Sequence, residues 1–367
     1  MNPKVTFIIP CYKLAHLLSE CVNSILGQTY GNFEVLIMDD CSPDDTPAVA
    51  QSFSDPRVNY IRNEANLGHL RNYNKGIELA RGEYIWLISA DDYLLQSYVL
   101  ERYVASMGAH PEVGYICCAG MEVRNDVKKL AKYTLKADQD TIFNGHAFLK
   151  ELLYCRNIFA PSVMVRSECY RKLGCFPVDM PYAGDGYIWG LYALHHDVAF
   201  LAEPMVAYRI HDLSMTDSIL NSKPDICVDD DLAVLWRLKE RIKAAGHVRL
   251  AEECCRAIGY EYARLAIGKR FRFRQISMTL QQCDESVRRF AENADEAKWI
   301  RARLRVSLGD LYFQAGNRPK ARQSYVSGMR EYWWMPKSWL KLLLLVLGNV
   351  GKFIRIAAFQ VRSTASY

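Results

Sequence analysis

The feature that most constrains the fold is a short apolar segment that ends close to two adjacent acids. Residues Tyr84 to Ile88 are aromatic or aliphatic, follow a glycine-containing turn and show no helical spacing. They therefore favour a central strand of a parallel sheet. Asp91 and Asp92 come shortly after this strand. Because ligands of open α/β sheets bind beyond the carboxyl ends of the strands, both acids are expected at a binding edge.

Two neighbouring carboxylates repel each other, and both stay ionised beside a buried strand only if a cation compensates them. A hard divalent metal with oxygen ligands would do so, and it could be shared with the phosphates of a substrate. The alternative is that an Asp at a strand-to-helix turn only caps the helix. This segment, taken alone, leaves both interpretations open.

The same pattern occurs earlier in the chain, where an apolar run at 34–38 is followed by Asp39 and Asp40. Apolar runs of this kind alternate with helical spacing, which predicts a parallel, doubly wound α/β sheet. The predicted strands are 5–9, 34–38, 58–61, 84–88 and 113–119, and the predicted helices are 17–25, 48–53 and 68–80.

The sequence contains neither the GxGxxG fingerprint of dinucleotide-binding folds nor the GxxxxGK[ST] phosphate loop. Phosphates must therefore be held in another way. The simplest arrangement is a metal that bridges Asp91 to a diphosphate, while Asp39 or Asp40 accepts hydrogen bonds from a nucleobase or a ribose.

Several of these segments also carry a family resemblance. In chain order they are Val5 to Tyr12, Ser24 to Thr29, Glu34 to Asp40, Asn66 to Gly68 with Arg71 and Asn72, and Ser89 to Asp92. Together they resemble the ordered motifs of the family 2 glycosyltransferases. The resemblance implies a GT-A fold, with a Rossmann-like, mixed and mostly parallel sheet flanked by helices. It also implies an inverting enzyme with a nucleotide-sugar donor, foremost a UDP-sugar, and Mn²⁺ or Mg²⁺ as cofactor.

The resemblance further implies roles for particular residues. Those expected to bind the nucleotide sugar are Pro10, Tyr12, Asp39, Asp40, Gly68, Arg71, Ala90 and Asp91. Asp91 would be the metal ligand of the family's Asp-x-Asp motif, with Asp92 and His211 as further ligands. The first acid of that motif is Ser89 here, so the contact it usually makes is weaker or is taken by Asp92. Arg209-x-His211 resembles a family loop over the donor, where neutral imidazole suits Mn²⁺ better than Mg²⁺.

A later segment, Tyr182 to Trp189, resembles the family's catalytic-base motif, in which an acid opens a helix after a loop. Its acid is Asp185. An inverting transfer needs one carboxylate to take the proton of the acceptor hydroxyl, separate from the group that neutralises the departing diphosphate. A helix N-terminus would also lower the pKa of this Asp and favour its charged form. The alternative is that Asp185 only caps the helix.

Length and charge suggest how the rest of the chain is organised. With 367 residues, half of them hydrophobic, the chain is long enough for about two domains. We expect a catalytic domain at 1–220, a helical region at 221–330 without further strands, and a basic amphipathic helix at 331–367. Residues 297–367 hold 13 Lys and Arg against 2 Asp and Glu, a surplus of +11 that indicates an anionic partner.

Within the helical region, residues 304–327 resemble a helix-turn-helix of the tetratricopeptide type. One such unit is not an array, so a bundle packed on the catalytic domain is also expected. The apolar run at 342–347 is too short to cross a bilayer, which takes ~20 residues. Drawn as a helix, residues 340–362 place basic side chains on one stripe, which suits either an anionic membrane surface or docking on the bundle.

The sequence therefore predicts an inverting, metal-dependent glycosyltransferase that acts on an acceptor hydroxyl in the synthesis of a cell-surface glycan. The acceptor would be a glycan or a lipid-linked saccharide, and no nucleic acid is expected as a partner. The protein would lie in the cytoplasm, either free or on the inner face of the cell membrane. Two alternatives stay open: a nucleotidyltransferase, and an inactive binding scaffold in a polysaccharide assembly complex.

Overall fold

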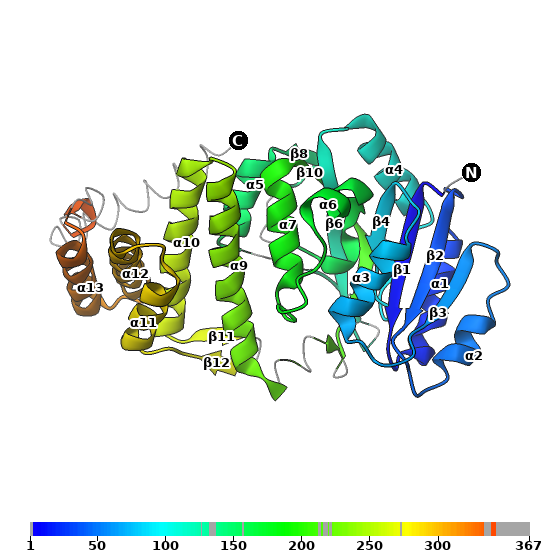
Figure 1. Ribbon diagram of the computed structural model, residues 1–367, viewed down its shortest axis with the longest axis horizontal. Coiled ribbons are helices and arrows are strands. Elements are labelled where there is room, and N and C mark those ends of the chain that lie inside the picture. The colour runs from blue at the N-terminus through cyan, green and yellow to red at the C-terminus, as the bar shows by residue number, and fades with distance from the viewer. Residues whose placement is uncertain are drawn as a thin grey trace. The chain divides into compact units, whose positions relative to one another are not determined.

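A computed structural model describes residues 3–125, 127–131, 137–155, 158–211, 214–215, 219, 222–271, 274–333 and 339–342. The chain divides into two compact units, Met1–Arg241 and Ile242–Tyr367 (Figure 1). The division falls inside helix α9 (Pro224–Ala244). The sequence analysis expects the boundary earlier, near residue 220. Each unit is described by itself.

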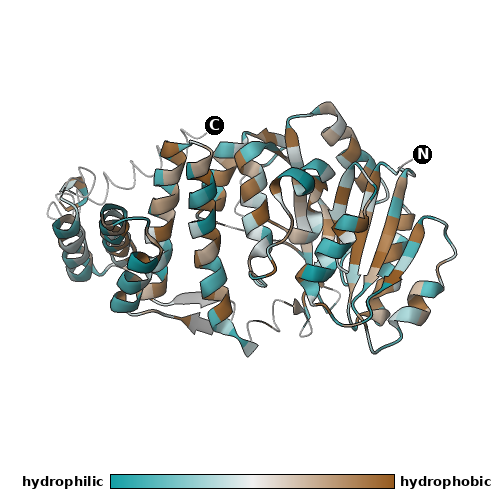
Figure 2. Ribbon diagram, viewed as in Figure 1, coloured by the Kyte–Doolittle hydropathy of each residue, from teal (hydrophilic) through white to brown (hydrophobic). Residues whose placement is uncertain are grey.

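The first unit is built on a mixed sheet whose central order is β3-β2-β1-β4-β9-β6-β10-β5. One half is parallel throughout: β1 (Val5–Cys11) pairs with both β2 (Phe33–Asp39) and β4 (Tyr84–Leu87), and β2 pairs with β3 (Val58–Arg62). All seven residues of β1 and of β2 are buried, as expected for strands covered on both faces. Figure 2 shows these strands as predominantly hydrophobic.

The other half of the sheet combines both strand directions. Strand β6 (Val113–Arg124) runs parallel to β10 (Asp197–Arg209), whereas β9 (Met164–Arg166) is antiparallel to β4 and β6. Short strands complete the sheet, namely β5 (Tyr93–Leu94), β7 (Val127–Leu130) and β8 (Thr141–Phe143). The helices of this unit, besides α9, are α1 (Ala15–Leu26), α2 (Thr46–Gln51), α3 (His69–Leu79), α4 (Val99–Ala109), α5 (Gly145–Leu152), α6 (Ser167–Leu173) and α7 (Gly184–His195). The predicted mixed, mostly parallel sheet with flanking helices is confirmed.

Stacked aromatic rings connect the parallel half of the sheet to α4. Trp86 on β4 stacks on Phe7 of β1 at 5.4 Å and on Tyr103 of α4 at 4.2 Å between ring centroids. The polar atoms of these buried rings are satisfied: Trp86 Nε1 donates to the Pro161 carbonyl at 2.8 Å, and the Tyr103 hydroxyl donates to the Ser162 carbonyl at 2.9 Å. Because both carbonyls belong to the short 3₁₀ turn Ala160–Ser162, the aromatic stack anchors the segment that leads into β9.

The second unit is mostly helical. Its helices are α10 (Val248–Ala266), α11 (Leu280–Phe290), α12 (Ala294–Gln314) and α13 (Arg318–Glu331). Helices α12 and α13 are joined by a tight turn at Gly316, whose φ of +78° suits glycine. They form the hairpin expected near 304–327, and Tyr325 is buried in its core beside Ala302, Val306 and Ala321.

The expectation of no strands in this region is wrong. A two-stranded antiparallel hairpin, β11 (Lys269–Phe271) with β12 (Arg274–Ile276), lies between α10 and α11. Strands of three residues are too short to show an alternating pattern, which is why the sequence did not reveal them. Most of the predicted helix at 331–367 lies outside the described residues. Within the described part of the chain, no helix is both long and apolar enough to cross a bilayer.

The approach of β4 to β1 can be tested at Gly82, whose amide donates to Thr6 Oγ1 at 2.8 Å. A Cβ at this position would lie 2.5 Å from the Thr6 backbone nitrogen, so Gly82→Ala must push the strands apart. We expect the free energy of unfolding, measured in urea, to fall by about 1–3 kcal/mol. Gly31→Ala is the matched control, because no atom lies within 4 Å of its new Cβ. Equal stability of the two variants would contradict the packing described for this edge.

Candidate active site

The carboxyl ends of three neighbouring parallel strands meet at one edge of the sheet. Strand β1 lies between β2 and β4, and its last residues bind the chain that leaves each neighbour. The Asp40 amide donates to the Cys11 carbonyl at 2.9 Å, and the Ala90 amide donates to the Pro10 carbonyl at 3.2 Å. The structure thereby brings together the residues predicted at this edge, from Pro10 to Tyr12, Asp39 and Asp40, and Ala90 to Asp92. Tyr12 lies at this edge with 42% of its surface exposed.

Asp39 is fully buried, and the protein itself compensates its charge. One carboxylate oxygen accepts a hydrogen bond from the Ser42 amide at 2.8 Å. The other accepts the Tyr60 hydroxyl at 2.7 Å and is ion-paired with Arg62 at 2.9 Å. Proximity to Asp39 also contributes to a raised pKa of the Tyr60 hydroxyl, after burial, which is the larger cause. This Asp therefore needs no external cation.

Asp40 organises the loop that leads into α3. Its Oδ1 accepts the Leu67 amide at 2.8 Å and the Asn63 side-chain amide at 2.9 Å, and its Oδ2 accepts the Gly68 amide at 3.0 Å. Gly68 has a φ of +79°, a conformation that glycine adopts without strain. A carboxylate has about four acceptor positions, so one remains for a ligand. Arg71 lies in the first turn of α3 and is exposed.

One carboxylate oxygen of Asp91 has a hydrogen-bond partner, and the other has none among the described residues. Its Oδ2 lies 2.9 Å from His211 Nε2, which follows the end of β10. Its Oδ1 is buried and has no hydrogen-bond partner among the described residues. The Arg209 guanidinium donates to the Asp91 carbonyl at 2.8 Å and so fixes the backbone at this point. Asp91 and His211, separated by 120 residues, were both predicted for the site, and the structure places them in contact.

The side chain of the adjacent Asp92 makes a different contact. Its Oδ1 accepts the Arg209 amide at 3.0 Å, and its side chain is buried. Burial, and then the charge of Asp91, raise the pKa of Asp92 well above its usual value. Ser89 occupies the position where the family has an acid. Its carbonyl accepts a hydrogen bond from the Asp92 amide at 3.0 Å, and this bond starts the turn that carries both acids.

The residues at this edge fit a divalent cation whose coordination is completed by the substrate. Among the described residues no three His, Cys, Asp or Glu side chains gather closely enough to form a closed metal site. An open site needs fewer protein ligands, because Mg²⁺ and similar ions keep waters and bind substrate phosphates. An unpaired, buried carboxylate oxygen beside an imidazole nitrogen supplies one hard and one borderline ligand, a set that suits Mn²⁺.

Asp185 lies in the first turn of α7 and is half-buried. The N-cap of this helix is Ala183, which makes no side-chain capping bond, and Asp185 Oδ1 accepts the Gly186 amide at 2.6 Å. Asp185 thus satisfies one free amide of the first turn but does not occupy the capping position itself. Its role as the catalytic base stays a prediction.

That loop is anchored from two sides by residues that the sequence analysis missed. On α9, Asp230 Oδ2 accepts the amides of Tyr182 at 2.6 Å and Ala183 at 3.2 Å. On α3, Asn74 pairs with both the amide and the carbonyl of Phe176, at 3.0 and 2.8 Å, and His69 lies 2.9 Å from the Pro181 carbonyl. Asp230 belongs to the run Asp229 to Asp231, which has the pattern of a solvated helix face, so no sequence signal marked it.

Tyr73 of α3 packs against the loop that precedes α7. Its ring packs edge-on against Phe176 and His69, each at 5.5 Å between centroids. Burial raises the pKa of the Tyr73 hydroxyl, and the negative charges of Asp91, Asp185 and Asp92 raise it further.

Comparison with known proteins concerns the family and the fold. Residues 6–159 match the model of glycosyl transferase family 2. The uncharacterized glycosyltransferase EpsJ of Bacillus subtilis is 35% identical over 269 residues, which cover 69% of this chain and 73% of EpsJ. An uncharacterized glycosyltransferase of Rickettsia typhi is 28% identical over 60% of this chain and 68% of its own length. The crystal structure of S. aureus TarS 1–349 with UDP shares the fold, with a TM-score of 0.59, 16% identity and coverage of 90% and 91%.

The anchoring role of Asp40 can be measured as stability. Asp40→Ala leaves the Leu67 amide and one hydrogen of the buried Asn63 side-chain amide without an acceptor. An unsatisfied buried group costs about 1–3 kcal/mol, so we expect the free energy of unfolding in urea to fall by about 1–3 kcal/mol. Asp45→Ala, a replacement in the neighbouring turn at a residue that makes no side-chain cap to α2, is the control and should change stability by less than about 0.5 kcal/mol. An unchanged midpoint for Asp40→Ala would rule out this role.

Proposed function

The chain belongs to glycosyl transferase family 2, and we propose that it is an inverting, metal-dependent enzyme. It moves a sugar from a nucleoside-diphosphate sugar to an acceptor hydroxyl. The observation that carries the proposal is the presence of two separate carboxylates: Asp91, whose buried Oδ1 has no partner among the described residues and whose Oδ2 contacts His211, and Asp185, at the start of α7. These are the two acidic functions that such a transfer needs.

The donor would bind along the ends of β1 and β2. Tyr12 supplies an exposed aromatic ring for the nucleobase, beside the buried Pro10 at the end of β1, and the remaining acceptor position of Asp40 can take a hydrogen bond from the base or ribose. Arg71 is exposed in the first turn of α3, where a cation could meet the diphosphate. A UDP-sugar is the favoured donor, a choice supported by the TarS structures, which were solved with UDP and with UDP-GlcNAc.

Asp91 and His211 would hold the cation, Mn²⁺ before Mg²⁺ because one ligand is an imidazole. When bound, the cation offsets the negative charge that develops on the departing diphosphate. Two features of the chain favour this cation. Asp91 Oδ1 has no hydrogen-bond partner among the described residues, and Arg209 fixes the Asp91 backbone. Asp92 as a further ligand stays a prediction.

Asp185 would take the proton of the acceptor hydroxyl as that oxygen attacks the anomeric carbon in line with the leaving diphosphate. Its position depends on the loop that precedes α7, which Asp230 binds from α9 and which His69 and Asn74 bind from α3. These anchors keep the carboxylate at a fixed distance from the donor, and proximity of this kind accounts for much of the rate of enzymatic group transfer.

The acceptor would be a growing surface polysaccharide or a lipid-linked saccharide, built at the inner face of the cell membrane. The named relatives support the glycosyltransferase activity, and the proposed base suits any acceptor that offers a hydroxyl group. The two alternatives raised by the sequence differ in product. A nucleotidyltransferase would release pyrophosphate, and an inactive scaffold would release nothing.

The role of Asp185 is tested by Asp185→Asn, which keeps the size of the side chain but removes the base. We expect the rate of transfer from UDP-GlcNAc or a related donor, measured as released UDP, to fall by about 10²–10⁴-fold. The affinity for UDP, measured by calorimetry, should change by less than about twofold, because the base does not contact the nucleotide.

Asp179→Asn is the matched control, since Asp179 lies in the same loop, is exposed and is ion-paired with Arg237. Loss of a surface pair should leave the rate within about threefold of the parent. Unchanged turnover of Asp185→Asn would remove this residue from the mechanism.

The metal site is tested by titrating UDP into the protein with and without Mn²⁺. We expect Mn²⁺ to tighten UDP binding at least about tenfold in the parent chain and to have no effect in Asp91→Ala. Asp55→Ala, which removes an acid paired with Arg57, is the control and should keep the full Mn²⁺ effect. Identical UDP affinities with and without Mn²⁺ in the parent chain would overturn the metal site.

A further inference from the structure

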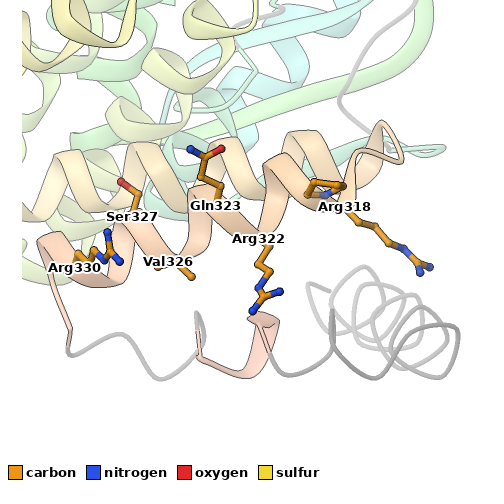
Figure 3. A pocket seen from close by; sticks show the side chains of 7 residues that line it. Arg318, Arg322, Gln323, Val326, Ser327 and Arg330 are labelled. Atoms are coloured by element: carbon orange, nitrogen blue, oxygen red, sulfur yellow. The ribbon is translucent and has the colours of Figure 1, made fainter.

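Helix α13 carries a row of arginines beside its packed face. The packed face holds Ala321, Tyr325, Gly328 and Met329, which are buried, and the helix packs against α12. Next to this face, Arg318, Arg322, Val326 and Arg330 follow one another at intervals of four residues and form a single stripe. Figure 3 shows these side chains along the helix, with Gln323 and Ser327 beside them.

The charge of this stripe is uncompensated. Arg318, Arg322 and Arg330 are exposed, and none forms an ion pair or side-chain hydrogen bond with another described residue. The only acid of α13, Glu331, points away from the stripe and is ion-paired with Arg301 on α12 at 2.9 Å. Other arginines of this unit are neutralised in the same manner, for example Arg305, which pairs with Asp284. The stripe is therefore a row of three cationic side chains with no acidic partner among the described residues.

Large apolar side chains stand at the end of the stripe. Trp333 follows α13 directly with 70% of its surface exposed, and Trp339 and Leu340 are 54% and 55% exposed. The two tryptophans lie together, since Trp339 Nε1 donates to the Trp333 carbonyl at 3.2 Å. Lys341 is ion-paired with Asp310 of α12, so the exposed side chains of the neighbouring Trp339 and Leu340 belong to residues that lie beside the hairpin.

We infer that the arginine stripe of α13 and the exposed pair Trp333 and Trp339 form one surface that binds an anionic phospholipid membrane. Basic residues near a membrane are attracted to anionic headgroups, and tryptophan is favoured at the boundary between headgroups and hydrocarbon. A phosphate polymer would explain the arginines but not the exposed tryptophans, whereas a bilayer accommodates both. The inference rests on the proposed function only for the location of the acceptor.

The surface can be tested without any sugar donor, so that failure of the transfer reaction and failure of this inference are separate results. The full chain is sedimented with vesicles of phosphatidylcholine alone and of phosphatidylcholine containing about one-third phosphatidylglycerol. We expect binding only to the anionic vesicles. Each cation near the surface contributes about fivefold to affinity, so Arg318→Gln with Arg322→Gln and Arg330→Gln should weaken binding on the order of a hundredfold.

A matched control removes the same charge elsewhere in the unit. Arg288, Arg289 and Lys298 are exposed cations of α11 and α12, and their joint replacement by Gln should weaken binding by less than about threefold. Replacing the three stripe arginines by Lys keeps the charge and should restore binding to within about threefold. Equal losses in the stripe and control variants would show that total charge alone governs binding and would overturn the surface.

The tryptophans distinguish a bilayer from a soluble polyanion. Brominated phosphatidylglycerol vesicles should quench the fluorescence of the parent chain, and the quenching should be lost in Trp333→Ala with Trp339→Ala. Inorganic polyphosphate, added instead of vesicles, should bind more weakly than the vesicles and leave the fluorescence unchanged. Tight binding to polyphosphate together with no quenching by brominated lipid would assign the stripe to a phosphate polymer and refute the membrane surface.

Discussion

The site depends on the parallel pairing of β1 with both of its neighbours. Because β1 lies between β2 and β4 in one orientation, the segments that follow all three strands must leave the sheet at the same edge. The backbone bonds from Asp40 to Cys11 and from Ala90 to Pro10 extend that pairing beyond the strands themselves. Acidic residues separated by about fifty positions in the sequence are thereby brought to the same edge of the sheet, on either side of β1, which no local interaction could achieve.

Helix α3 connects the two halves of the proposed reaction. Asp40 binds the amides of Leu67 and Gly68 just before the helix begins, while the α3 side chains His69 and Asn74 hold the loop that leads to Asp185. In the proposed reaction, a helix bound at both places would set the distance between donor and base. The His69 contact uses a neutral ring, since burial lowers the pKa of this imidazole and disfavours its charged form.

The parts that sequence could predict are those in which the signal is local. Buried strands show as apolar runs, and the acids that follow them need only the rule on strand ends, so the edge from Pro10 to Asp92 was foreseen. The anchors of the base loop were not, because His69 and Pro181 are 112 residues apart and Asn74 and Phe176 are 102 apart. Such contacts depend on how helices pack on the sheet, and a polar residue on a helix gives no sign of them. The hairpin β11–β12 was missed for the opposite reason, since strands of three residues are too short to carry a pattern.

The two acid pairs show why a shared sequence pattern does not imply a shared function. The same argument from repulsion applies to both, yet Asp39 meets Arg62 and Tyr60 from the next strand, and Asp40 meets three amide donors. The second pair receives less: Asp92 accepts one backbone amide, and Asp91 keeps a buried oxygen with no partner among the described residues. A buried carboxylate oxygen without a donor is costly unless something else occupies it. Of these four acids, only Asp91 therefore calls for the proposed cation. The difference lies in the hydrogen-bond donors that the fold brings near each acid, since the acids themselves are alike.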